Sequence, residues 1–257
     1  MSSGIVVLKF GGTSLGSPGR VRRAAARVHA HLRRGRRPVV VVSAMGGATD
    51  RIVRLLGAVS PGGRPDGREA DRALATGEDL SAALLAAALR GRGVGARSLR
   101  GGEAGVCAAG AFCGARIEDV DPRPILSLVD SGTVPVISGF QGARDDGETV
   151  TLGRGGSDTS AVAIAAALGP APCHIITDVD AVFDRDPAVH ANARRIGEID
   201  PLALVVLAQS GARVIHAEAA RLALTHGVTL RVYAHWAPLS GRGGTVVRAA
   251  RALSEAA

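Results

Sequence analysis

The segment IVVLKFGGTS, residues 5–14, decides which fold class this chain adopts. Its first part, Ile5–Phe10, is a short and mainly apolar run that predicts a buried strand, and two glycines end the run. Ser17 and Pro18 then supply the cap and the first turn of a helix. A strand that passes through a glycine turn into a helix is the repeating unit of a parallel α/β sheet.

The same alternation of strand and helix continues along the chain. Further strands are predicted at Pro38–Ser43, Ala96–Arg100, Val134–Ser138, His174–Thr177 and Thr229–Tyr233, with a polar hairpin at Gly142–Val150. Helices are predicted from Ser17 to about Arg34 and at Thr49–Ala58, Leu80–Leu89, Pro122–Ser131, Thr159–Leu168, Pro201–Ser210 and Ala217–His226. This order predicts an α/β fold, a three-layer αβα sandwich with a mainly parallel central sheet. We expect one domain over residues 1–257, with two lobes that meet near residue 150.

The composition is that of a soluble globular protein. The chain has 257 residues, of which 46% are hydrophobic and 21% charged. No apolar stretch approaches the ~20 residues that a membrane-spanning helix needs, and the first residues lack the layout of a secretion signal. The three cysteines lack the spacing of metal ligands, which suggests free thiols in a reducing compartment. We therefore expect a cytoplasmic protein without a membrane partner.

Arginine supplies almost all of the positive charge. The formal net charge is +8, and Lys9 is the single lysine among 31 lysines and arginines. In a chain that otherwise uses arginine, a retained lysine suggests a tight phosphate site, where an ammonium and a planar guanidinium differ most; chance is the alternative. The arginines of residues 33–37 do not predict a nucleic-acid partner. They follow a helix end, where they complement the helix dipole, and no aromatic residues are interleaved for base stacking.

The first of two glycine-rich stretches follows the opening strand. Gly11 and Gly12 let the backbone approach a ligand closely, and Ser14 adds a hydroxyl group. Lys9 places a positive charge at the carboxyl end of the strand, where open α/β sheets bind their ligands. A simple strand-to-helix turn is the alternative interpretation, because paired glycines are common in such turns.

The second glycine-rich stretch is GRGGSDTS, residues 153–160, which precedes an apolar run. Gly155, Gly156 and Ser157 at a helix start predict an anion site, because backbone amides and the helix dipole point at the ligand. The stretch is neither a Walker A loop nor a dinucleotide fingerprint, since the required spacing is missing. Arg154 could hold a carboxylate by paired hydrogen bonds. Asp158 is either a helix cap or a group that orients the transferred phosphoryl and its metal.

Two acidic stretches are weaker signals. Glu78, within Thr76–Asp79, either complements the dipole of the helix expected at Leu80 or pairs with the ammonium group of an amino acid. Asp178 and Asp180 follow a strand end, where they either hold a ribose or a metal-bound water or are solvated turn residues.

Taken together, these stretches resemble the aspartokinases, which have the amino-acid kinase fold. The matching phrases are KFGGTS at 9–14, VVSA at 41–44 with Thr49, TGE at 76–78, GFQG at 139–142, TLGRGGSDTS at 151–160, TDVD at 177–180 and Asp186-Pro187. They occur in family order over residues 4–247. KFGGTS and GRGGSDT in one chain form a highly specific combination.

The resemblance implies a role for each matching residue. Lys9, on the ATP phosphates, and Asp158, which organises the reacting groups, are the expected catalytic residues. The expected aspartate pocket contains Ser43, Thr49, Glu78 at the substrate ammonium and Arg154 at the α-carboxylate. The expected nucleotide-binding residues are Lys9, Gly11, Gly12, Ser14, Gly155, Gly156, Ser157, Thr177, Asp178, Phe183, Asp186 and Arg213, the last where the family usually has lysine. The acid-substrate lobe is then about residues 1–150 and the nucleotide lobe about residues 151–257.

The implied reaction is the ATP-dependent phosphorylation of the side-chain carboxylate of L-aspartate to 4-phospho-L-aspartate. A carboxylate with a pKa of ~3.9 is already an anion at neutral pH and needs no general base. It needs relief of charge repulsion and in-line placement, which Lys9, Mg²⁺ and backbone amides supply. The implied cofactors are ATP and Mg²⁺, with the metal held mainly by the ATP phosphates and by no direct side-chain ligand.

Two alternatives stay open. One is a sister amino-acid kinase that acts on another amino acid or on a secondary-metabolite precursor. The other is a non-catalytic nucleotide-binding or regulatory protein, against which the intact Lys9, Arg154 and Asp158 argue. Aspartokinases usually continue into regulatory ACT domains, and this sequence ends at Ala257. We therefore expect no feedback control in cis, and regulation in trans by a separate subunit is an alternative. The expected assembly is a homodimer.

Overall fold

The fold is built around one large, mainly parallel sheet. The computed structural model describes residues 4–63, 65–185, 189–190, 192–209, 215–238 and 243–248. In this part of the chain the eight strands have the order β12-β14-β13-β9-β1-β2-β6-β3, and only β13 and β14 pair antiparallel. The strands are β1 (Ile5–Phe10), β2 (Arg37–Val42), β3 (Ala96–Leu99), β6 (Val134–Ser138), β9 (Cys173–Thr177), β12 (Glu198–Ile199), β13 (Leu230–Ala234) and β14 (Thr245–Val247).

Strand β1 lies inside this sheet, between β2 and β9. Val7 is in register with Val39 of β2 and with Cys173 of β9. Every residue of β1 is buried, because helices cover both faces of the sheet. Successive side chains point to opposite faces, so Val7 and Leu8 contribute to two different cores.

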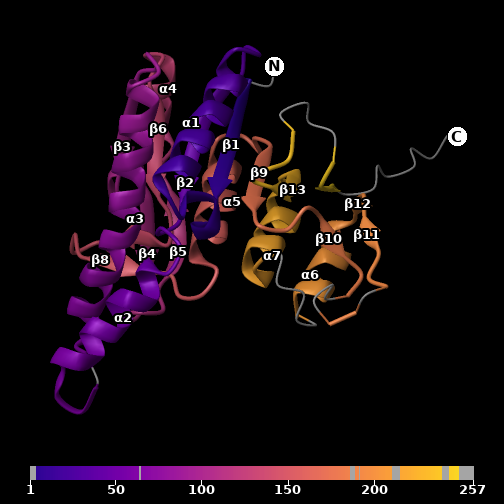
Figure 1. The fold of residues 1–257 in the computed structure, drawn as a ribbon. Helices are drawn as coiled ribbons and strands as arrows, with labels where there is room; N and C mark the ends of the chain where they lie inside the picture. Colours follow the sequence, from indigo (N-terminus) through magenta and orange to yellow (C-terminus); the bar gives the residue numbers. More distant parts are fainter. Residues whose placement is uncertain are drawn as a thin grey trace, which may run out of the picture.

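Two helical layers enclose the sheet (Figure 1). The helices α1 (Pro18–Leu32) and α3 (Gly67–Arg90) pack on one face, and α2 (Ala48–Val59) lies against α3. The other face carries α4 (Arg123–Asp130), α5 (Gly156–Ala167), α6 (Pro201–Gln209) and α7 (Ala217–His226). The predicted αβα sandwich is thereby confirmed. No described helix has the length and apolar character needed to cross a membrane.

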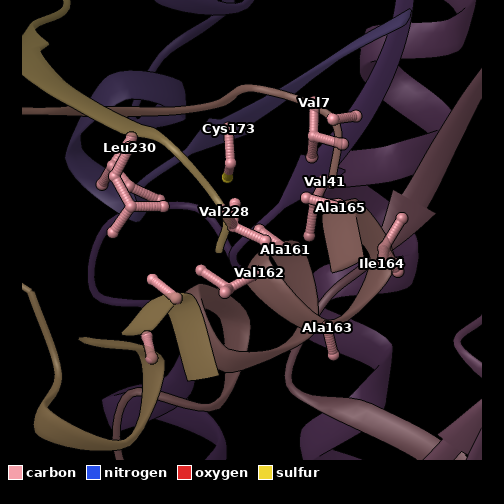
Figure 2. Packing of buried hydrophobic residues seen from close by; sticks show 14 of the residues in the cluster. Val7, Val41, Ala161, Val162, Ala163, Ile164, Ala165, Cys173, Val228 and Leu230 are labelled. Carbon is pink, nitrogen blue, oxygen red and sulfur yellow. The ribbon is translucent and has the colours of Figure 1, made fainter. Parts of the chain in front are cut away.

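Helix α5 is the best-buried helix of the second layer and positions the glycine-rich turn before it. Residues Thr159–Ala165 are all buried, as expected for a helix that is apolar on every side. Ala161 and Val162 pack in one cluster with Val7, Val41 and Leu230 (Figure 2). The small alanine side chains let α5 approach the sheet closely, so its first turn is held beside the ends of β1 and β2.

A second sheet lies beside the large one and includes strands that the sequence pattern did not predict. Its order is β5-β4-β7-β8, with β4 (Val106–Ala109), β5 (Arg116–Val120), β7 (Gln141–Ala143) and β8 (Thr149–Thr151). The antiparallel pair β7 and β8 confirms the predicted hairpin. The strands β4 and β5 are short and surrounded by glycine and polar residues, so tertiary pairing rather than local propensity defines them. A small ladder joins β10 (Val182–Phe183) and β11 (Arg195–Ile196), and short 3₁₀ turns occupy η1 (Gly12–Leu15), η2 (Pro61–Gly63) and η3 (Gly102–Ala104).

Helix α3 is much longer than the sequence predicted, and this corrects the placement of Thr76–Asp79. The helix begins at Gly67, where the Asp66 carboxylate accepts a hydrogen bond of 3.2 Å from the Glu69 amide. Thr76–Asp79 therefore lies inside the helix instead of before it. Glycine disfavours helix interiors, yet Gly77 lies inside this helix. Here a Cβ at Gly77 would lie 2.9 Å from the Ala44 Cβ, so the glycine lets α3 approach the end of β2.

Candidate active site

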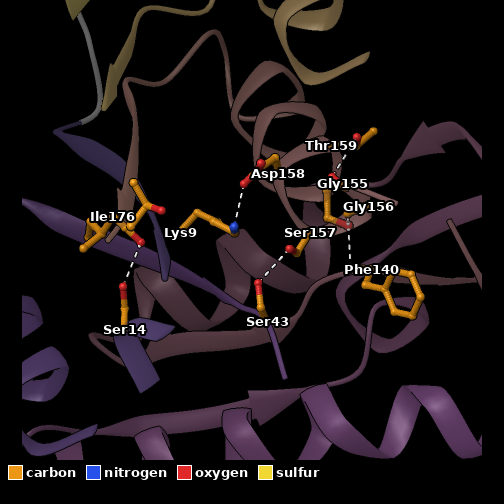
Figure 3. Close-up of polar contacts among 12 residues, drawn as sticks. Lys9, Ser14, Ser43, Phe140, Gly155, Gly156, Ser157, Asp158, Thr159 and Ile176 are labelled. Carbon is orange, nitrogen blue, oxygen red and sulfur yellow. Dashed lines mark hydrogen bonds and ion pairs between the residues drawn. The ribbon is translucent and has the colours of Figure 1, made fainter. Parts of the chain in front are cut away.

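The carboxyl ends of β1 and β2 meet the first turn of α5 at one edge of the sheet (Figure 3). Lys9 Nζ lies 2.6 Å from Asp158 Oδ1, and the two side chains are only 9% and 13% exposed. The hydroxyl groups of Ser43 and Ser157 share a hydrogen bond of 2.7 Å across the same junction. The fold thus brings together the two predicted catalytic residues, the predicted substrate-binding residue Ser43 and the predicted nucleotide-binding residue Ser157.

The Asp158 carboxylate has unused capacity as an acceptor. Its contact with Lys9 lacks hydrogen-bond geometry, and Oδ1 has no hydrogen-bond partner among the described residues. A carboxylate oxygen in this state fits a hydrated Mg²⁺ that arrives with nucleotide phosphates, because Mg²⁺ keeps several waters and takes few protein ligands. In the described part of the chain, no group of three or more His, Cys, Asp or Glu is placed to hold a metal ion alone.

The glycine turn after β1 is tied to the neighbouring strands. A Cβ at Gly12 would lie 2.6 Å from the Ala44 carbonyl oxygen, so only glycine fits. The Gly11 amide donates to the Ile176 carbonyl at 2.9 Å, and the Ser14 hydroxyl donates to the same oxygen at 3.1 Å. Ser14 is 2% exposed, so its hydroxyl holds the turn against β9, and a direct role toward a nucleotide stays a prediction.

The turn before α5 is equally constrained. Gly155 caps the helix with φ +73°, and a Cβ there would lie 2.1 Å from His216 Cγ. A Cβ at Gly156 would lie 2.9 Å from both Phe140 Cδ2 and Leu152 Cβ. The positive end of the α5 dipole lies beside the Lys9 ammonium, an arrangement that suits the anion site predicted from the sequence.

Glu78 places a buried carboxyl group behind the end of β2. It is 4% exposed, and its Oε1 accepts a hydrogen bond of 2.8 Å from the Ala44 amide. Burial raises the pKa of Glu78 from 4.5 to about 7, and Asp79 adds to this, whereas the Ala44 amide and Lys9 act in the opposite direction. A carboxyl group in this state becomes fully ionised when a cation binds beside it, which suits the ammonium group of an amino acid.

Comparison with known proteins agrees with this geometry. The model of the amino acid kinase family matches residues 4–233. The chain belongs to the amino acid kinase family. Aspartokinase from Geobacillus stearothermophilus is 44% identical over 245 residues, which cover 95% of this kinase and 59% of the relative.

Two solved structures extend the comparison of this amino acid kinase. Aspartate kinase from Synechocystis superposes with a TM-score of 0.82 at 39% identity, covering 95% of this chain and 40% of the other. E. coli aspartokinase III, in complex with aspartate and ADP, superposes with a TM-score of 0.85 at 27% identity, covering 95% and 64%. The resemblance to aspartokinases is thus confirmed, and the chain spans about three fifths of the length of the curated relatives, 59% of the first.

Further residues predicted to bind the nucleotide lie at the end of β9 and on β10. Thr177 ends β9 beside β1, its hydroxyl donates to Asp178 at 3.1 Å, and its carbonyl accepts from the His235 amide at 2.8 Å. Phe183 lies half-buried on β10. The predicted residues Asp186 and Arg213 lie outside the described residues.

The other two residues predicted to bind the acid substrate, Thr49 and Arg154, lie on α2 and in the loop before α5. Thr49 is half-buried in the first turn of α2, and Arg154 is exposed in the loop before α5. Among the described residues, Arg154 has no hydrogen-bond or ion-pair partner, so its guanidinium is available to a ligand. No hydrogen bond or ion pair in the described part joins Thr49 or Arg154 to Lys9. Their roles in binding the acid substrate stay predictions.

Sequence reasoning missed two residues that position the site. A Cβ at Gly139 would lie 2.8 Å from Ser157 Cβ, so the glycine allows the end of β6 to approach α5. Phe140 has φ +67°, which is uncommon for a non-glycine residue, and its amide donates to the Ser160 hydroxyl at 3.1 Å. The GFQG motif at residues 139–142 belongs to the family resemblance, but the motif alone did not indicate that Gly139 and Phe140 contact α5.

Replacing Glu78 with Gln should stabilise the protein at pH values above the pKa of Glu78. The pKa of Glu78 is about 7 in the folded protein and 4.5 in the unfolded chain. Between these pH values the folded protein binds more protons than the unfolded chain. The free energy of unfolding therefore falls as the pH rises through this range. Glu78→Gln keeps the acceptor for the Ala44 amide. We expect its melting temperature to exceed that of the wild type at pH 8 and to equal it at pH 4.

The matched control is Glu118→Gln, because Glu118 is exposed on β5. It should leave the melting temperature unchanged at both pH values. An equal rise in both variants, or no rise in Glu78→Gln at pH 8, contradicts the raised pKa of Glu78.

Proposed function

We propose that this amino acid kinase transfers the γ-phosphoryl group of ATP to the side-chain carboxylate of L-aspartate and forms 4-phospho-L-aspartate. The observation that carries the proposal is the nearly buried Lys9–Asp158 pair at the amino end of α5. Similarity to aspartokinases supports the choice of substrate, as does the complex of E. coli aspartokinase III with aspartate and ADP.

In this proposal the nucleotide phosphates bind between Lys9 and the turn before α5. The Lys9 ammonium and the backbone amides of Gly155, Gly156 and Ser157 neutralise the charge that develops as the γ-phosphoryl leaves. Binding displaces Lys9 from its contact with Asp158, whose carboxylate then orients the reacting groups. Mg²⁺, held mainly by the ATP phosphates, supplies further neutralisation of phosphate charge.

The acid substrate is proposed to bind in the residue 1–150 half of the sheet. Glu78 pairs with the ammonium group, Arg154 with the α-carboxylate, and Ser43 and Thr49 complete the pocket. The β-carboxylate then faces the γ-phosphoryl as an anion, so one of its oxygens forms the new P–O bond while the bond to ADP breaks, and no base is required.

The experiment is an ADP-release assay with an acid panel, in which hydroxylamine traps acyl phosphates as hydroxamates. L-Aspartate should give ADP and hydroxamate in equal amounts. L-Asparagine, which lacks the reacting carboxylate, should give neither. Succinate, which lacks the ammonium group, should lose ~10²-fold or more in kcat/KM, because it leaves the buried Glu78 carboxyl group unpaired.

Two outcomes overturn the proposal in different ways. Hydroxamate formed only with another acid, such as L-glutamate, indicates a sister kinase. ATP binding without turnover of any acid indicates a nucleotide-binding protein.

A further inference from the structure

A cavity lies near the amino ends of the central strands, whereas Lys9 lies near their carboxyl ends. It has a volume of about 270 Å³ and is enclosed by the amino ends of β1, β9 and β13, by α1 and by residues 237–238. Val6, His174 and Arg231 line it, each at the second position of its strand. Lys9 and Thr177 lie toward the carboxyl ends of the same strands, so this cavity is separate from the proposed kinase site.

The lining of this cavity is strongly basic. Arg27, Arg34, Arg36 and Arg231 contribute to it, and among the described residues no Asp or Glu lines it. The carboxyl end of α1 contributes a partial negative charge of only about half an elementary charge, which is less than the charge of Arg27 alone.

Arg27 shows that part of this charge is buried without a carboxylate. Its side chain is 6% exposed, and its guanidinium donates to the carbonyls of His235 at 3.0 Å and Ala237 at 2.6 Å. The guanidinium also lies 5.2 Å from the centre of the Tyr233 ring. Buried charges are normally paired with an opposite charge. A neutral carbonyl group stabilises a buried cation less than a carboxylate would. Within the described residues, Arg27 has no acidic partner.

Two neutral histidines add hydrogen-bonding groups to the same wall. The rings of His31 and His174 meet edge to face with centres 5.6 Å apart. Burial lowers the pKa of His31 to about 4 and that of His174 to about 3. Every charged neighbour that contributes to these pKa shifts is basic, which indicates a positive potential inside the cavity.

We propose that this cavity binds a small polyvalent oxyanion of the phosphate or polycarboxylate class, a function beyond the proposed phosphoryl transfer. Guanidinium groups bind such oxyanions through paired, charge-assisted hydrogen bonds. The volume equals about nine water molecules at ~30 Å³ each, which suits a diphosphate or citrate. A zwitterionic amino acid is disfavoured, because the arginines repel its ammonium group.

The test is calorimetric titration of the intact protein with pyrophosphate, and in parallel with citrate, in magnesium-free buffer. Arg36→Glu reverses an exposed charge that lines the cavity, and Arg33→Glu makes the same change three positions away, outside the lining. We expect Arg36→Glu to weaken pyrophosphate binding by about tenfold or more, since it removes a charge-assisted contact and adds a negative charge. Arg33→Glu should change the Kd by less than about twofold.

Binding of pyrophosphate at the nucleotide site is identical in the three proteins, so only the difference between the variants reports this cavity. If citrate also binds more weakly to Arg36→Glu than to Arg33→Glu, the site accepts polycarboxylates as well. If citrate does not bind, the site is restricted to phosphates. Equal weakening in both variants, or none in Arg36→Glu, overturns the proposal.

A second readout is the NMR titration of the His31 imidazole. A bound anion should raise its pKa above the value of about 4, because it offsets the field of the surrounding arginines. An unchanged His31 titration in the presence of saturating pyrophosphate also overturns the proposal.

Discussion

Lys9→Met should lower kcat for phosphoryl transfer by about 10³-fold or more, because a positive group at the transferred phosphoryl is worth this much in related transition states. Lys9 is the single lysine of the chain, it is 7% exposed, and its ammonium faces the amino end of α5. Methionine is an unbranched side chain one atom shorter than lysine, so it keeps most of the packing and removes the ammonium group. Steady-state assays with aspartate, and ATP-binding measurements on the same protein, separate the loss of chemistry from the loss of binding.

Stability must be separated from catalysis in this experiment. Lys9→Met leaves the Asp158 carboxylate, which is 13% exposed, without its cation, so the single variant should also melt at a lower temperature. The double variant Lys9→Met/Asp158→Asn removes both charges and should recover most of the melting temperature while it stays inactive. Lys9→Arg keeps the charge but not its compact shape, and it should remain strongly impaired. Normal turnover by Lys9→Met contradicts the proposed site.

Gly155→Ala should lower kcat/KM for ATP by ~10²-fold or more, because a displacement of about 1 Å in a positioning group can cost this much. The added methyl group would lie 2.1 Å from His216 Cγ and 2.3 Å from His216 Cβ, distances that no contact tolerates. The turn before α5, or the start of α7 at His216, must therefore move. Either movement changes the position of the amides that face Lys9.

Gly169→Ala is a matched control at the other end of α5. Gly169 has φ +78°, close to the +73° of Gly155, but a Cβ there meets nothing within 4 Å. Both substitutions carry the backbone strain of about 1–2 kcal/mol that a left-handed alanine costs. Only Gly155→Ala adds a clash at the anion site, so Gly169→Ala should lower the melting temperature without lowering kcat/KM for ATP. Equal kinetic losses in both variants would mean that strain alone, and not the clash, explains the effect.

Much of the fold follows from local pattern. The predicted strand Ile5–Phe10 agrees with β1 at both ends, because a short, mainly apolar run with β-branched residues and flanking glycines favours a buried strand. The short strands β4 and β5 could not be predicted, since their residues acquire a preference only when they pair with each other and with β7. The early start of α3 was missed as well, and within that part of the helix Gly77 packs against Ala44, which is distant in sequence.

The sequence by itself determined the chemistry that is present: one lysine, two glycine-rich turns and acidic residues at the ends of predicted strands and helices. Only the tertiary structure decided which of these groups meet, because contacts such as Lys9 with Asp158 join segments that local interactions never bring together. It also decided the ionisation of Glu78, since burial behind β2 is the largest cause of its raised pKa and neighbouring Asp79 only adds to it. The basic cavity has the same origin, because packing of α1 on the sheet brings Arg27 and His31 beside His174 of β9 and Arg231 of β13.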